Sequence, residues 1–324
     1  MLRKLGATAL SARVLSKAST PVLRIGSASD VGAALALMHS RRVGALLVCA
    51  SASAAEACVP LGLLTERDVL EKIGFDTPLA SVRVGDVMTS QQEGIELADA
   101  DDSLDDVLAR MQSGGFGHMP VVRGGLAIGM VSLRDIAHAI VQERGSDTAA
   151  ASISAADLCG ARSRTINLGS LARPACVEAP PSASVADAVL MMRRWGAGSV
   201  LVPSQGPSVG RSRHACGIFT ERDYLRLLGS AAALNQSIDP RTVALARCCT
   251  PASELVSAAA ATPAIECLAT MARQHIRHLP VMQEAEADAG FELGESDEPR
   301  APPALLAVLS ARDVLAQFLL RPAF

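Results

Sequence analysis

Hydrophobic residues fall into one arrangement that recurs four times along the chain. Four stretches place apolar residues three and four positions apart, which is the spacing of one face of an α-helix. These stretches begin at Val31, Leu104, Val185 and Ile265. A short apolar strand follows each of them, and a second strand then runs into another amphipathic helix. With a short strand ahead of the first helix, the pattern predicts four units of strand, helix, strand, strand and helix.

A polar motif marks the point in each unit where the last strand enters the last helix. The four copies are GLLTERD at 62–68, GMVSLRD at 129–135, GIFTERD at 217–223 and AVLSARD at 307–313. The first and third copies share Thr-Glu-Arg-Asp, whereas the second and fourth share Ser-x-Arg-Asp and a preceding His-Met/Leu-Pro-Val strand. This alternation indicates that a module of two units was itself duplicated.

Each unit is too small to bury its own sheet. About 60 residues supply a sheet with one apolar face, so a partner unit has to cover that face. We therefore expect consecutive units to pair into two modules, packed together as an α+β disc within one chain. The predicted divisions are 1–18 for an address-like segment, 19–78 and 79–144 for the first two units, 145–165 for a linker, and 166–232 and 233–324 for the last two.

The units differ in length mainly in the turn between their second and third strands. Insertions occur there at 50–60, 204–216 and 283–303. The last insertion is rich in Asp and Glu, and we expect it to be a solvated loop.

Composition argues against two classes of protein. Of the 324 residues, 49% are hydrophobic and only 2% are aromatic, and the formal net charge is -3. A surface that stacks nucleic-acid bases needs exposed aromatic rings and positive charge, and this chain offers little of either. No stretch reaches the roughly 18 to 20 uninterrupted apolar residues of a membrane span. We therefore expect a soluble protein that binds neither nucleic acid nor membranes.

The cysteines and the N-terminal segment bear on the cellular compartment. The 8 cysteines have no regular spacing, so we expect reduced, mostly buried thiols rather than a disulfide framework. Residues 1–29 carry several Lys, Arg, Ser and Thr residues and no acid, which suits a mitochondrial transit peptide. A plastid or cytoplasmic location is the alternative, because the whole chain is rich in Ala and Arg.

The repeated motifs resemble tandem cystathionine-β-synthase-type (CBS) domains, whose pairs are called Bateman modules. The resemblance covers about residues 20–319 and is closest, through GIFTERDYL at 217–225 and IRHLP at 276–280, to stand-alone CBS-pair proteins of bacteria and plant organelles. Ala307, where the other units have Gly, and the long insertions depart from the family pattern. The resemblance implies an α+β fold of four βαββα repeats that binds adenine nucleotides and requires no cofactor.

In the families that this chain resembles, the repeated Thr/Ser-x-x-Asp holds a ribose, because a carboxylate accepts hydrogen bonds from sugar hydroxyls. Carried over to this chain, the candidate pairs are Thr65 with Asp68, Ser132 with Asp135, Thr220 with Asp223, and Ser310 with Asp313. The same spacing at a helix start also predicts a capping box, which needs no ligand. An Asp where the box prefers Glu or Gln, and an Arg before it, favour the ligand, but both interpretations stay open.

Basic residues beside the motifs supply further candidates. His118 and His278 occupy matching positions at the second strand, and Arg277 adds a bidentate phosphate donor beside His278. Contact with phosphate or base competes here with an ordinary surface or core histidine. The motif arginines either reach phosphate or pair with a neighbouring carboxylate; they are Arg67, Arg134, Arg222 and Arg312. His275 and His278 have the spacing of one helix face, but no third ligand accompanies them, so no metal site is expected.

Adjacent Cys248 and Cys249 align with Val87 and Met88 of the earlier repeat. On this alignment Cys249 replaces a packing methionine, with oxidation sensing as the alternative.

Together these features predict a non-catalytic regulatory module that binds AMP, ADP or ATP in clefts between units and passes their occupancy to an unidentified partner protein. The alternative is a ligand-independent interaction scaffold, which the number of acids available as helix caps supports. An enzyme is not expected, because no nucleophile is paired with a base at fixed spacing. Homo-oligomer formation stays open.

Overall fold

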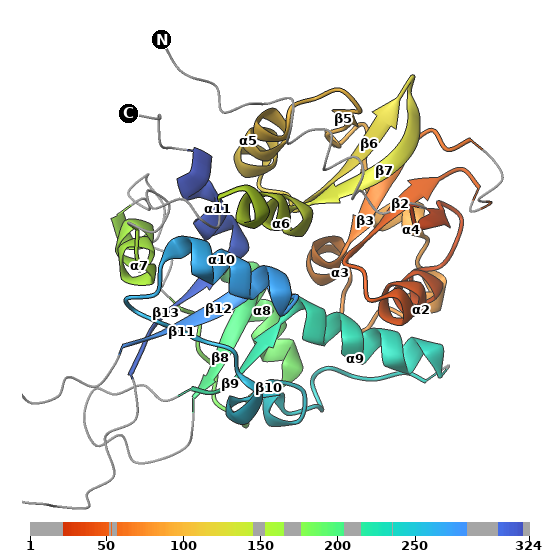
Figure 1. Ribbon diagram of the computed structural model, residues 1–324. Helices are drawn as coiled ribbons and strands as arrows, with labels where there is room; N and C mark the ends of the chain where they lie inside the picture. Colours follow the sequence, from red (N-terminus) through yellow and green to blue (C-terminus); the bar gives the residue numbers. More distant parts are fainter. Residues whose placement is uncertain are drawn as a thin grey trace, which may run out of the picture.

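The computed structural model contains four small β-sheets with helices packed against them (Figure 1). The residues it describes are 22–51, 53, 57–144, 153–164, 176–203, 215–234, 236–283 and 304–319. The predicted address-like segment 1–18 and residues 284–303 of the acid-rich insertion lie outside them. The α+β class predicted from the sequence is confirmed.

The first two units follow the predicted order of elements. Unit one consists of β1 (Arg24–Gly26), α2 (Val31–Arg41), β2 (Ala45–Cys49), β3 (Gly62–Thr65) and α3 (Glu66–Lys72). Unit two consists of β5 (Ala98–Asp99), α5 (Leu104–Gly114), β6 (His118–Arg123), β7 (Leu126–Ser132) and α6 (Leu133–Arg144). The connection between them contains η1 (Leu79–Ser81), α4 (Val84–Val87) and β4 (Thr89–Ser90).

The second two units repeat this order. Unit three consists of α8 (Val185–Trp195), β8 (Ser199–Pro203), β9 (Ala215–Thr220) and α9 (Glu221–Ala233), and a single parallel bridge between Glu178 and Leu201 takes the place of a first strand. The connection contains η3 (Leu245–Arg247), β10 (Thr250–Pro251) and η4 (Ala252–Glu254). Unit four consists of β11 (Ala258–Ala259), α10 (Ala264–Arg273), β12 (His278–Gln283), β13 (Ala304–Ser310) and α11 (Ala311–Leu319).

The second strand of the unit is the middle strand of the sheet in units two and four, whereas β9 is the middle strand in unit three. In unit two, β5 runs parallel to β6 and β7 runs antiparallel to it, and β11, β12 and β13 repeat this in unit four. Units one and three each gain an edge strand from the connection that follows them, because β4 pairs with β3 and β10 pairs with β9. Gly62 permits the first of these approaches, since a Cβ there would lie 2.6 Å from the carbonyl oxygen of Thr89.

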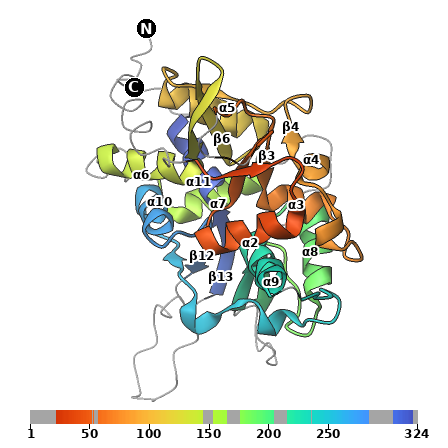
Figure 2. The same cartoon turned by 90° about the vertical axis from the view of Figure 1, so that its right-hand side faces the viewer.

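The hydrophobic core joins the units in two directions. Small clusters join the sheets of consecutive units, such as Leu47 and Leu63 of unit one with Met130 of unit two. The two large clusters instead join unit one with unit three and unit two with unit four. In both views α2 lies beside α9 (Figures 1 and 2). The predicted pairing of consecutive units therefore describes the sheet faces, whereas the larger part of the core forms between the two modules.

The predicted linker contains a helix, α7 (Ala155–Arg164), that the apolar pattern did not reveal. Ala155 and Leu158 are buried in the core shared by units two and four, and the backbone nitrogen of Ala155 donates to the carbonyl of Thr262 at 2.7 Å. Few apolar residues suffice for this helix because a partner surface buries them. The segment that follows unit two thus completes the packing of unit four.

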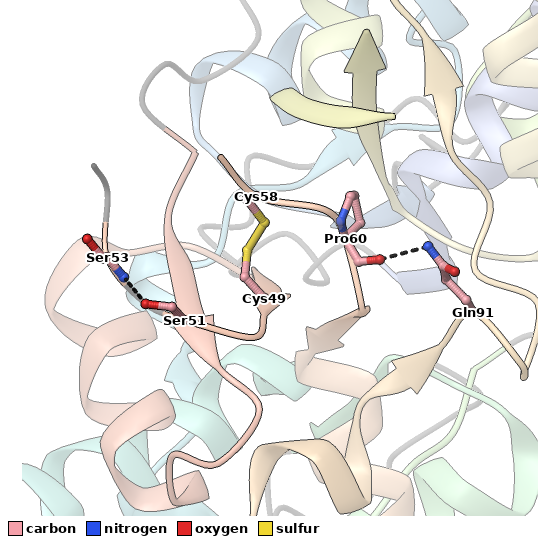
Figure 3. Close-up of a disulfide and its surroundings, with 6 residues drawn as sticks. All are labelled: Cys49, Ser51, Ser53, Cys58, Pro60 and Gln91. Carbon is pink, nitrogen blue, oxygen red and sulfur yellow. Dashed lines mark hydrogen bonds between the residues drawn. A yellow bond between two sulfur atoms is a disulfide. The ribbon is translucent and has the colours of Figure 1, made fainter. Parts of the chain in front are cut away.

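A disulfide joins Cys49, at the end of β2, to Cys58, in the segment before β3 (Figure 3). Both cysteines are buried, and the carbonyl of Cys58 accepts a hydrogen bond from the backbone nitrogen of Ala127 in β7 at 2.8 Å. The prediction that the cysteines are reduced is therefore wrong for this pair. Sequence spacing could not show it, because the antiparallel return of the chain from β2 to β3 brings the two Cα atoms to 5.8 Å.

Candidate functional site

A cavity of about 530 Å³ lies where the four units meet. Each unit contributes to its walls through the start of its last helix or the strand beside it. Three of the four predicted Thr/Ser and Asp pairs line it; they are Thr65 with Asp68, Ser132 with Asp135, and Ser310 with Asp313. His118, Arg277 and His278 line it as well. Thr220 and Asp223 do not, so the structure brings together most of the predicted site residues but not all of them.

All four aspartates form capping boxes at the starts of their helices. In each, one carboxylate oxygen accepts from the backbone nitrogen of the Thr or Ser at 2.8–2.9 Å and from its hydroxyl at 2.6–2.8 Å. The aspartate nitrogen donates back to the same hydroxyl oxygen at 3.2–3.4 Å. These contacts satisfy helix-end donors and acceptors without a ligand.

The aspartates of units one and three have further partners and are buried. The second oxygen of Asp68 accepts from the hydroxyl of Thr89 at 2.7 Å and pairs with Lys72 at 3.2 Å. That of Asp223 pairs with Arg226 at 3.0 Å. The two residues are only 5% and 7% exposed. Desolvation by burial raises the pKa of Asp223, while the hydrogen bonds from Thr220 and the charge of Arg226 oppose that rise.

The aspartates of units two and four are only half buried, and each lies near a histidine. Strand register places His118 directly across from Ser132, and His278 directly across from Ser310. In units one and three the corresponding strand positions hold Ala45 and Ser199. A His-Ser-Asp set therefore faces the cavity in units two and four alone among the described units.

Positive charge gathers around His118. Desolvation, and after it the charges of Arg277, Arg134 and Arg222, together lower the pKa of this imidazole to about 3. Desolvation also lowers the pKa values of Arg134 and Arg222, although both remain cations at any physiological pH. A neutral imidazole surrounded by guanidinium groups can donate one hydrogen bond to an anion without adding charge of its own.

Two glutamates that the sequence analysis did not single out lie at the same centre. Glu66 pairs with Arg277 of unit four and with Arg222 of unit three, at 3.6 Å for the second pair. Its counterpart Glu221 lies 3.7 Å from Arg67 of unit one. Arg67 and Arg222 thus pair with carboxylates of the opposite module. The signal for these glutamates was their presence in the motifs of units one and three only.

The two other predicted features have different outcomes. His275 follows the end of α10 and has a φ of 55°, so it does not share a helix face with His278. The alignment of Cys249 with Met88 agrees with the packing, because a Cβ at Gly217 would lie 3.1 Å from Cys249 Sγ and one at Gly62 would lie 2.6 Å from Met88 Sδ.

Within the described ranges, no group of three metal-ligating side chains occurs. Nor does any helix in this part of the chain have the length and apolar character to cross a bilayer.

Sequence comparisons point to one domain family. The family model described as "CBS domain" matches residues 84–142, which span α4 to α6. The curated protein CBS domain-containing protein CBSX3, mitochondrial, from Arabidopsis thaliana is 34% identical over 107 residues. That match covers 33% of this chain and 50% of the plant protein, so the chain spans about half the length of this curated relative.

Solved structures share the architecture of the whole chain. Protein MJ1225 of Methanocaldococcus jannaschii, described as a candidate archaeal homologue of g-AMPK, has a TM-score of 0.68 at 16% identity, with coverage of 94% of this chain and 99% of that one. An uncharacterized conserved protein from Pyrococcus horikoshii has a TM-score of 0.50 at 14% identity with the same coverage. These likenesses extend the fold over all four units.

Proposed function

The chain is a CBS-domain protein, and from that premise we propose that it is a non-catalytic regulatory module that binds adenine nucleotides in its central cavity and signals their presence to a partner protein. The observation that carries this proposal is the cavity of about 530 Å³, where ribose-binding candidates and cationic groups face one space. Such a volume lies in the range of small-molecule sites.

The sets in units two and four supply the most suitable groups for such a ligand. Asp135 and Asp313 are partly exposed to the cavity, so a ribose hydroxyl can donate to a carboxylate that is already fixed by its cap. His118, His278 and Arg277 lie on the same walls and suit the phosphate end. Thr65 and Asp68 reach the cavity too, but both Asp68 oxygens already have partners.

Calorimetry on the full chain with AMP, ADP, ATP, NADH and S-adenosylmethionine tests this function. We expect one or more of the adenine nucleotides to bind, and we expect the double variant Asp135→Asn with Asp313→Asn to weaken binding at least about tenfold, as loss of charge-assisted hydrogen bonds implies. Asp223→Asn is the matched control, because it removes the same kind of cap outside the cavity. Absence of heat with every compound, or equal weakening by the control, contradicts the proposal.

A ligand-independent scaffold is the second candidate, and the four complete capping boxes favour it. The two functions differ in one measurable respect. A scaffold keeps its affinity for a partner when nucleotide is added or removed, whereas a nucleotide-responsive regulator changes it.

We also propose that the protein works in a mitochondrion. The name of the curated plant relative and the acid-free composition of residues 1–29 support this location. Imaging the full chain in cells, with and without residues 1–18, tests it; import that persists without them contradicts the role assigned to that segment.

A further inference from the structure

Arg277 occupies an unusual position in the repeat. The residue before the second strand of a unit accepts, through its carbonyl, a hydrogen bond from the first residue of the last helix. Units one, two and three use a glycine there; the residues are Gly44, Gly117 and Gly198. Unit four has Arg277, whose carbonyl accepts from Ala311 at 2.8 Å. The backbone role is therefore kept, and a guanidinium group is added that three of the four units lack.

This guanidinium group is held by Glu66 of unit one. The Glu66 side chain is only 5% exposed and binds Arg277 and Arg222, which belong to the two units of the opposite module. A Cβ on Gly44 would overlap Arg277 and lie 3.1 Å from Glu66, so the pair fits against bare backbone. The cap of α3 is made by Thr65 and Asp68, and it does not need Glu66.

The fold does not depend on the ion pair between Glu66 and Arg277 for its stability. Burying an ion pair costs desolvation that its Coulomb attraction only partly returns, so such pairs often contribute little net stability. Units two and four form the same helix start with Leu133 and Ala311 in place of a glutamate. Because its ion pair adds little net stability, the buried carboxylate of Glu66 can have a role in ligand binding at this point of the cavity.

We propose that Glu66 competes with the phosphate group of the ligand for the guanidinium group of Arg277. In the ligand-free protein its carboxylate neutralises Arg277, and a phosphate that enters the cavity takes this guanidinium over. The phosphate carries more charge than a carboxylate and can bind the guanidinium through two oxygens. This inference rests on the proposed nucleotide function and names how that site is regulated.

Displacement of Glu66 links ligand occupancy to the contact between modules. A carboxylate that loses Arg277 while it stays buried is poorly compensated, so it has to reorient or rely on Arg222 alone. Arg222 also donates to the carbonyl of His275 at 2.8 Å, which ties unit three to unit four beside the same centre. Ligand binding therefore changes contacts that join unit one to both units of the other module.

Calorimetry with two probes, AMP and adenosine, tests the proposal on the full-length protein. Glu66→Gln is expected to raise the affinity for AMP about tenfold and to leave that for adenosine unchanged, because adenosine has no phosphate to compete for Arg277. Glu221→Gln, which removes a negative charge from the same cavity without releasing Arg277, is the matched control and is expected to have a smaller effect. An unchanged or lowered AMP affinity in Glu66→Gln overturns the proposal.

A double-mutant cycle separates competition from a general loss of negative charge. In an Arg277→Gln background, Glu66→Gln should no longer raise AMP affinity; a gain of the same size in both backgrounds overturns the proposal. If Glu66→Gln does not fold, Glu66→Leu, which supplies the residue type of Leu133, takes its place. If the wild-type protein binds AMP and the Glu66→Gln variant binds it no more tightly, only the competing role of Glu66 is refuted. Absence of binding in both refutes the nucleotide function as well.

Discussion

Units one and three use the shared motif differently from units two and four. In the first pair, Asp68 and Asp223 are deeply buried and have partners on both carboxylate oxygens. In the second pair, Asp135 and Asp313 make the same cap but stay partly exposed at the cavity, near His118 and His278. The motif by itself therefore builds a helix start, and the residues around it decide whether its carboxylate is buried or partly exposed at the cavity.

The surroundings differ through a few neighbouring positions. Lys72 follows Asp68 at the i,i+4 spacing and reaches its second oxygen, whereas Ala139 holds that place after Asp135. The position after the Thr or Ser is Glu66 in unit one and Leu133 in unit two, so unit two has no counterpart there of the carboxylate that pairs with Arg222 and Arg277 of the opposite module. A small change of side chain thus separates a structural unit from a candidate binding unit.

The largest expected effect compares how much the two large hydrophobic clusters contribute to the free energy of unfolding. Phe219 of unit three and Val131 of unit two hold the same motif position, and both are buried. Phe219→Ala is expected to cost about 3 to 5 kcal/mol, because the ring leaves a large cavity, and Val131→Ala about 2 kcal/mol. Urea unfolding measures both free energies. Equal losses would show that the core between units one and three does not depend on its larger side chain.

The next effect compares the two kinds of aspartate. Asp68→Asn removes a cap and the contacts with Lys72 and Thr89, so we expect a loss of about 2 to 3 kcal/mol in the free energy of unfolding. Asp135→Asn removes the cap and should cost about 1 kcal/mol. Chemical denaturation of the two single variants measures the difference. A larger loss at Asp135 would reverse the structural distinction between the units.

The smallest effect concerns the pH dependence that His118 adds to unit two. Its pKa is lowered from 6.5 to about 3, so the folded state binds the proton more weakly than the unfolded state. The stabilising contribution is full above pH 6.5 and is lost as the pH falls towards 3. Between pH 7 and pH 5 we expect a loss of about 1 to 2 kcal/mol.

Replacement of the imidazole isolates this contribution. His118→Gln should flatten the dependence of unfolding free energy on pH, measured in urea at both pH values, relative to the wild-type protein. His39→Gln, which changes an exposed histidine on α2, is the control. A His118→Gln protein that loses as much stability on acidification as the wild type would refute the lowered pKa of His118.

Sequence patterns predicted much of the architecture and part of the site. The helical spacing that begins at Val31, Leu104, Val185 and Ile265 corresponds to α2, α5, α8 and α10. Local patterns also predicted the capping geometry, because Thr65 and Asp68 are three residues apart at a helix start. Helix α7 escaped prediction because its burial depends on unit four, and the Cys49–Cys58 disulfide escaped because two strands bring its ends together.

By itself the sequence determined the elements, their fourfold repetition and the polar motif at each helix start, since helix periodicity, strand alternation and capping depend on residues within a few positions of one another. Only the tertiary structure decided that the large cores cross between the modules, that Glu66 meets Arg277, and that Asp223 lies outside the cavity while Asp135 lines it. Those outcomes depend on contacts between residues far apart in the chain, and four similar units can be arranged in more than one way without changing any local pattern.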